Sequence, residues 1–178
     1  MIHQLGEYTL RPPDPHDLEA LYQQKNDPEV AGLLGGFING YSREDIRQWI
    51  DYHHKQRDEV VLIIADAAND RCLGHVGLYQ IEHRTGSAEF AILIGDRASW
   101  GKGLGRICTR FMLEYGFAQL HLHRISLEVL ASNERALRLY RNVGFREEGR
   151  KRDAQYKNGQ YHDVICMGVL HSEYSRDH

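Results

Sequence analysis

A glycine-rich segment, Trp100-Gly-Lys-Gly-Leu-Gly-Arg106, stands directly before an amphipathic stretch and has the residue types needed to bind phosphate groups. Glycines let backbone amides approach a ligand closely, and the first turn of a helix presents unpaired N–H groups with partial positive charge. Lys102 and Arg106 add positive charge beside these amides. The segment is therefore a candidate diphosphate cradle, although a plain strand-to-helix turn would carry the same glycines.

Two other glycine-rich phosphate loops do not fit this segment. A P-loop places Ser or Thr after its lysine, whereas Gly103 follows Lys102 here. A dinucleotide fingerprint that starts at Gly103 needs Gly or Ala where Cys108 stands, and it belongs near the start of a parallel unit. Three strands of antiparallel type precede these glycines instead, so both alternatives are excluded.

A second cluster of chemistry-bearing residues lies on the helix predicted over 133–143, which begins after Asn133 and carries Tyr140. A phenol with a pKa near 10 can protonate a departing thiolate, whose thiol has a pKa near 8.5. Tyr140 also shares a helical face with Ala136, so a core tyrosine is the structural alternative. Asn133 can likewise serve only as the helix cap.

Together, these motifs resemble the GNAT superfamily of N-acetyltransferases. The resemblance covers about residues 88–170 and is strongest to the branch that contains ribosomal-protein N-terminal (alanine/serine) acetyltransferases and spermidine acetyltransferases. Gly103 and Gly105 fill the glycine places of the motif Gln/Arg-x-x-Gly-x-Gly/Ala, and Trp100 is the aromatic variant of its first position. The family's Leu-Tyr-x-x-x-Gly-Phe signature matches at Tyr140. The resemblance implies an acyl-CoA N-acyltransferase fold of the α/β (α+β) class, acetyl-CoA as co-substrate and no metal.

The resemblance also implies roles for individual residues. Tyr140 is expected to be the general acid, and Asn133 is expected to contact the pantetheine arm or a nearby backbone group. Glu89 is the candidate base that deprotonates the acceptor directly or through water, with an exposed or salt-bridged glutamate as the alternative. A bulged strand is expected to offer amides around Ile92, Leu93 and Ile94 to the pantetheine and the thioester oxygen. The remaining cofactor-binding residues are expected to be Gly101, Lys102, Gly103, Leu104, Gly105 and Arg106.

Hydrophobic periodicity and turn residues predict the elements around these motifs. Asp14 and Ser42 are the expected caps of the first two helices, and Asn158-Gly159 is the expected turn of a final hairpin. The order implies a mixed, mostly antiparallel central sheet with helices on both faces, in a single domain spanning 1–178. Strands are expected at 7–11, 60–65, 72–81, 88–94, 125–129, 146–153 and 161–170, and helices at 14–26, 42–57, about four turns from Leu104, and 133–143, with a loop at 27–41.

Composition narrows the function further. A chain of 178 residues with a formal net charge of −3 fits one domain and lacks the basic excess of a general nucleic-acid binder. We find no signal-peptide pattern and no membrane-length apolar run, so we expect a cytoplasmic protein without membrane contact. The histidines lack metal-ligand spacing. The cysteines, which lie among apolar neighbours, are expected to be buried structural thiols: Cys72, Cys108 and Cys166.

The expected reaction is direct transfer of an acetyl group from acetyl-CoA to a primary amine in a ternary complex. The acceptor stays open between a protein N-terminus and a small-molecule amine such as a polyamine. Its pocket is expected between the loop 27–41 and the turn near 156–161. The alternative is a non-catalytic acyl-CoA-binding sensor, which would bind the thioester without acceptor-dependent thiol release. The oligomeric state is open, with a homodimer as one option.

Overall fold

One sheet organises the molecule. The computed structural model describes residues 2–34, 40–53 and 55–174, in which eight strands follow the order β1-β2-β3-β4-β5-β6-β8-β7. Neighbouring strands are antiparallel except for β5 and β6, which are parallel. The predicted mixed, mostly antiparallel sheet is therefore confirmed. Its strands are β1 (His3–Leu5), β2 (Tyr8–Arg11), β3 (Val60–Asp66), β4 (Cys72–Glu82), β5 (Ser87–Ile94), β6 (Arg124–Leu130), β7 (Arg146–Lys157) and β8 (Gln160–Leu170).

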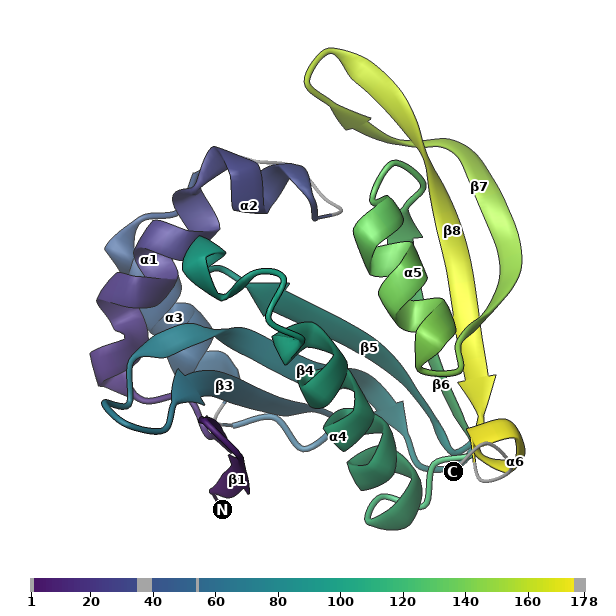
Figure 1. The fold of residues 1–178 in the computed structure, drawn as a ribbon, viewed down its shortest axis with the longest axis horizontal. Helices are drawn as coiled ribbons and strands as arrows, with labels where there is room; N and C mark the ends of the chain where they lie inside the picture. Colours follow the sequence, from purple (N-terminus) through teal and green to yellow (C-terminus); the bar gives the residue numbers. More distant parts are fainter. Residues whose placement is uncertain (1, 35–39, 54, 175–178) are drawn as a thin grey trace.

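Helices cover both faces of this sheet (Figure 1). The pair α4 and α5 packs on one face, and α1 with α3 packs on the other. Strand β3 reads as a continuous apolar run because both of its faces are covered. Its Leu62 and Ile64 point into the α4 core, whereas Ile63 points into the α1–α3 core. The helices are α1 (Leu18–Asn26), α2 (Pro28–Gly32), α3 (Arg43–His53), α4 (Leu104–Ala118), α5 (Glu134–Asn142) and α6 (His171–Tyr174).

The parallel pair β5–β6 is short, and this shortness shapes the site. Backbone pairing joins only three positions of each strand, from Ser87 opposite Arg124 to Glu89 opposite Ser126. Beyond Glu89 the two strands diverge, and the half of the sheet that contains β8 and β7 swings away from β4 (Figure 1). Five residues at the end of β5, positions 90–94, therefore have a pairing partner only on the β4 side.

Two helix starts follow the cap signals in the sequence. Asp14 and Asp17 form a reciprocal capping box ahead of α1, as predicted. The short helix α2 lies inside the segment predicted as the loop 27–41, so that prediction was wrong for its first part. Asp27 caps α2 with its carboxylate, and Pro28 takes the first helical position. These two signals were present in the sequence, but a helix this short shows no hydrophobic period. Positions 35–39 of the predicted loop lie outside the described residues.

The C-terminal hairpin is longer than predicted and projects beyond the rest of the sheet (Figure 1). Asn158 and Gly159 form its turn with φ of 50° and 77°, which is the left-handed pair that an Asn-Gly turn favours. The outer strand was predicted to end at Asp153, but β7 continues to Lys157. Its polar residues give no alternation to follow, and its register shifts between Lys151 and Gln155.

Candidate active site

A cavity of about 520 Å³ opens where β5 and β6 diverge. Its floor is the end of β5, and its walls come from the glycine-rich segment, β6 and α5 on one side and from α1, β4 and the end of α2 on the other. Ten of the predicted site residues line this one cavity: Ile92, Leu93, Ile94, Gly101, Gly103, Leu104, Gly105, Arg106, Asn133 and the expected acid Tyr140. Lys102 and Glu89 do not.

The glycine-rich segment has the backbone that a phosphate cradle requires. Gly101 and Gly103 have φ of 78° and 81°, in the left-handed region that side chains disfavour. The first helical hydrogen bond of α4 runs from Ile107 N to Gly103 O at 3.1 Å. The backbone N–H groups of Leu104, Gly105 and Arg106, in the first turn of α4, have no acceptor within the helix. They lie at the positive end of the helix dipole, where an anion binds favourably.

Contacts with neighbouring elements hold this cradle in place. A Cβ at Gly105 would lie 2.8 Å from Leu139 Cδ1, so the glycine lets α5 approach α4 closely. The Trp100 indole Nε1 donates to Ile94 O at 2.8 Å, which ties the cradle to the end of β5. The Arg135 guanidinium lies 5.3 Å from the Trp100 ring centroid and adds positive charge from α5. The aromatic residue at the first motif position therefore has a structural task.

The register of β5 decides which of its amides face the gap. Gly95 N donates to Leu73 O at 2.9 Å, and antiparallel pairs alternate between bonded and non-bonded positions. Leu93 thus exchanges hydrogen bonds with β4, whereas Ile92 and Ile94 direct their N–H and C=O groups toward the gap. The hydrogen bond from the Trp100 indole to Ile94 O agrees with this alternation, because it shows the Ile94 carbonyl directed away from β4. A bulge was expected here, but the β4–β5 register is regular from position 89 to 94, and its one shift lies earlier, between Tyr79 and Glu82 of β4. The gap at positions 90–94 therefore follows from the end of the β5–β6 pairing.

Tyr140 stands in the cavity wall with its ring in the core. The residue is 8% exposed, and its ring packs edge-on against Phe90 and Phe145 at centroid distances of 6.1 and 5.8 Å. Burial raises the pKa of Tyr140 to about 12, so the phenol keeps its proton over the working pH range. No described residue hydrogen-bonds its hydroxyl. Tyr140 can therefore pack in the core with its ring and still serve as the general acid with its hydroxyl.

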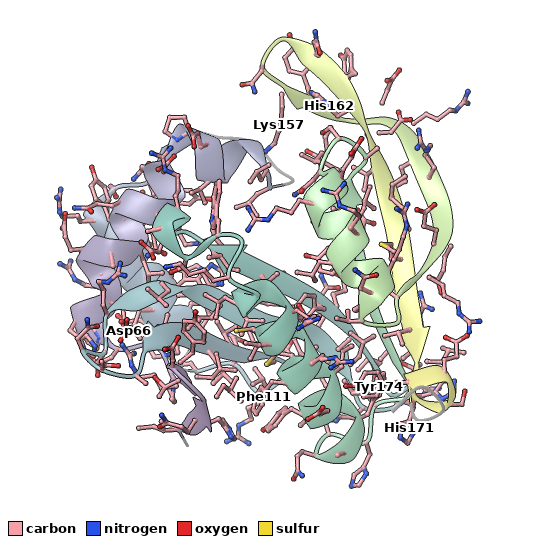
Figure 2. All side chains as sticks on the ribbon, in the orientation of Figure 1. Asp66, Phe111, Lys157, His162, His171 and Tyr174 are labelled. Atoms are coloured by element: carbon pink, nitrogen blue, oxygen red, sulfur yellow. The ribbon has the colours of Figure 1, made fainter. Side chains whose placement is uncertain are left out.

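Asn133 and Lys157 hold the end of α2 over the cavity. The Asn133 amide caps α5 through Ala136 N at 3.1 Å and donates to Leu33 O at 3.2 Å, so its contacts here are a helix cap and a backbone carbonyl. The Lys157 ammonium donates to Ala31 O at 2.7 Å and also to Leu34 O. Figure 2 shows Lys157 on the side of the hairpin that faces α2. Sequence reasoning gave no signal for this clamp of Asn133 and Lys157 on the end of α2, because the bonded residues are 100 or more positions apart.

Charged residues at the open face of β5 and β6 complete the site. Glu89 is exposed and accepts a hydrogen bond from Gln80 Nε2 at 3.4 Å, outside the cavity lining. Glu128, on β6, lines the cavity and pairs with Lys151 of β7. Lys102 instead lines a second cavity of about 490 Å³ beside Asp96. No motif in the sequence had singled out Glu128.

The cysteines and histidines of the described segments support neither a covalent intermediate nor a metal. Cys72 and Cys108 are buried, as predicted, and burial raises the pKa of each thiol to about 12, which disfavours the thiolate. Cys166 is only half-buried, so the prediction of burial was wrong for this thiol. No group of three His, Cys, Asp or Glu side chains within residues 2–34, 40–53 and 55–174 could hold a metal ion. None of the described helices has the length and apolarity to span a bilayer.

A parallel strand pair that diverges over a cavity, with a helix N-terminal cradle on one wall, defines a site for an acyl-CoA-dependent transferase. The family model of the acetyltransferase (GNAT) domain matches residues 8–146. The chain belongs to this family and is an acetyl-CoA-dependent N-acetyltransferase, which sets aside the sensor alternative.

Relatives match over nearly their whole length. The chain is 32% identical to a spermidine N(1)-acetyltransferase of Vibrio cholerae, covering 95% of this chain and 96% of that protein. It is 26% identical to the putative ribosomal N-acetyltransferase YdaF of Bacillus subtilis, covering 93% and 92%. The crystal structure of spermidine N-acetyltransferase from Vibrio cholerae in complex with CoA and spermine superimposes with a TM-score of 0.87 at 31% identity, covering 95% of this chain and 98% of that one. These comparisons confirm the family and the branch predicted from the motifs.

Proposed function

We propose that this enzyme acetylates the primary amine of a small molecule by direct attack on acetyl-CoA in a ternary complex. The observation that carries the proposal is a single cavity that joins the cradle at α4 to the carboxylate of Glu128 and to the end of α1. A coenzyme and an acceptor entering from opposite ends would meet at β5. The relatives named for spermidine acetylation, and the neighbour crystallised with spermine, support a small-molecule acceptor.

The cradle and its surroundings would bind the coenzyme. The free amides at residues 104–106 suit the diphosphate, and Arg106 and Arg135 place positive charge beside it. Gly101 and Gly103 provide the left-handed turns that bring those amides to the cavity. Lys102 would contribute only as a nearby charge, since it points to the other cavity.

The chemistry would take place against the unpaired edge of β5. The free amine attacks the thioester carbon, and the amides of Ile92 and Ile94, which face the gap, donate to the oxygen as it gains charge. Tyr140 then gives its proton to the departing sulfur. Leu93 also lines the cavity, but its amide pairs with β4. No covalent acyl-enzyme is needed.

Glu89 is the proposed base, and it would act through water because its carboxylate lies outside the cavity lining. Glu128 lies on the neighbouring strand, two positions beyond the residue opposite Glu89, and would hold the ammonium before deprotonation. Lys151 forms an ion pair with Glu128 in this structure, and the ammonium of the acceptor would replace Lys151 as the partner of Glu128.

Thiol release from acetyl-CoA, measured with a panel of primary amines, tests the proposal. Acceptor-dependent release is expected, and tight coenzyme binding without such release would contradict it. A pH–rate profile of Glu89→Gln tests the base, because an acidic limb that does not move would remove Glu89 from that role.

A further inference from the structure

Lys25 places a cation at the end of the cavity away from the coenzyme cradle. We call this end the acceptor half, because the acceptor would enter there. Lys25 lies in the last turn of α1, lines the cavity, and holds its Nζ 4.7 Å from the Trp49 ring centroid and 5.5 Å from that of Tyr41. Tyr41 is fixed there because its backbone N donates to Asn26 Oδ1 at 2.8 Å. None of the described carboxylates forms an ion pair with Lys25. Burial lowers the pKa of Lys25 to about 8, so the ammonium prevails at neutral pH, with the faces of Trp49 and Tyr41 beside it.

His75, on β4, lies beside this cation and has unused hydrogen-bonding capacity. It is 8% exposed, lines the cavity, and neither ring nitrogen has a partner within the described residues. Its ring centroid lies 4.8 Å from that of Trp49, the same ring that receives Lys25. Burial, with Lys25 from α1 and His53 from α3 nearby, lowers the pKa of His75 well below its usual range. A buried ring N–H left without an acceptor is unfavourable, and a suitable ligand atom would remove that cost.

Glu128 gives the opposite wall the opposite charge. It stands on β6, whereas His75 stands on β4, so the two residues are separated by β5. Two strand spacings amount to about 10 Å, and the divergence of β6 adds to that distance. The acceptor half of the cavity therefore has a carboxylate at one wall and a cation with an unpaired imidazole at the other. This polarity fits a molecule with an ammonium at one end and an anion at the other.

We propose that Lys25 and His75 form a subsite for an anionic group of the acceptor, so that the preferred acceptor is an amine that carries a carboxylate or a similar anion several bonds from the reacting nitrogen. The inference rests on the proposed acetyl transfer to a small-molecule amine and names the substrate class. A polyamine bound in the same direction would place its distal ammonium against Lys25, and like charges in a poorly hydrated site repel. Specificity would thus differ from the activity for which the spermidine acetyltransferases are named.

Three amines with one six-carbon chain test the subsite: 6-aminohexanoate, hexylamine and 1,6-diaminohexane. For the wild-type enzyme we expect the carboxylate compound to exceed hexylamine in kcat/KM by roughly 10- to 100-fold, the range of a charged hydrogen bond, and the diamine to fall below hexylamine. Lys25→Met should reduce the ratio of 6-aminohexanoate to hexylamine to near unity, whereas Lys25→Arg should preserve most of it. Lys55→Met, the same change at an exposed lysine outside the cavity, is the matched control and should leave the ratio unchanged.

The outcomes separate this inference from the proposed function. Turnover of hexylamine without an advantage for 6-aminohexanoate, or with a preference for the diamine, overturns the subsite and leaves acetyl transfer to amines intact. No acceptor-dependent thiol release with any amine overturns both. Since the wild-type ranking is informative alone, the test does not depend on the folding of the Lys25 variants. An unchanged ratio in a folded Lys25→Met enzyme would also overturn the subsite.

Discussion

Replacing Tyr140 by Phe removes one hydroxyl group from the wall of the cavity and changes nothing else in the covalent structure. The ring would keep its edge-on contacts with Phe90 and Phe145. No hydrogen bond to a described residue is lost. The substitution therefore separates the structural role of this side chain from its proposed role as the acid.

The expected size of each effect follows from these contacts. Because the hydroxyl has no described protein partner, its loss should alter the free energy of unfolding by less than about 1 kcal/mol, or a few degrees in Tm. Loss of a positioned general acid typically lowers a rate by about 10²- to 10⁴-fold, which corresponds to about 3–5 kcal/mol in the activation barrier. We expect kcat to fall by this factor, with little change in the KM for acetyl-CoA.

The raised pKa of Tyr140 makes a second expectation possible. With a pKa of about 12, the phenol stays protonated at all pH values below about 11, so deprotonation of Tyr140 should not limit the wild-type kcat there. An alkaline limb with an apparent pKa near 10, absent from the Phe variant, would show that burial does not protect this proton and that the electrostatic argument is wrong.

Thiol release at saturating acetyl-CoA, with thermal unfolding of the same samples, measures both quantities. Tyr52→Phe is the matched control, because Tyr52 is 55% exposed on α3, outside the cavity lining, and should retain full kcat and Tm. Full turnover in a folded Tyr140→Phe enzyme would refute the acid role. A large loss of Tm without a kinetic defect would instead make the tyrosine a core residue only.

Three further expectations concern stability and the clamp on α2. Asp17→Asn should destabilise the fold by about 3 kcal/mol in chemical denaturation, because it breaks a buried bidentate pair with Arg11, with both N–O distances at 2.8 Å; a change below about 1 kcal/mol would contradict this. Lys157→Met should raise the KM for the acceptor and lower Tm, since the Ala31 carbonyl loses its donor at the cavity wall; an unchanged KM would show that the clamp does not shape the site. Because the pKa of Lys25 is lowered in the folded protein, the unfolded chain binds more protons than the folded one between pH 8 and 10.5. The destabilisation caused by burying the Lys25 ammonium is therefore complete below pH 8 and disappears above 10.5. The stability advantage of Lys25→Met over wild type should shrink across this window, and a pH-independent difference would contradict the shift.

The sequence by itself determined the features that arise within short segments. Gly101 and Gly103 are needed for left-handed backbone before α4, and that requirement can be predicted from residue type alone. The cap at Asp14 and the Asn-Gly turn follow from the same local rules. The motif around Tyr140 identified the family, which the comparisons confirm. The sheet could be predicted because alternation and apolar runs are local patterns as well.

Only the tertiary structure decided which groups meet at the site. The pairing of β5 with β6 ends at Glu89, and any apolar strand would have allowed it to continue; this ending frees the amides of Ile92 and Ile94. Lys25 and His75 come from different elements and share the Trp49 ring through packing, which no spacing in the sequence encodes. Local patterns specify backbone conformation because they act over a few residues. The direction of a free amide and the residues around a buried charge depend on register and packing between distant segments. They are therefore set only when the whole chain has folded.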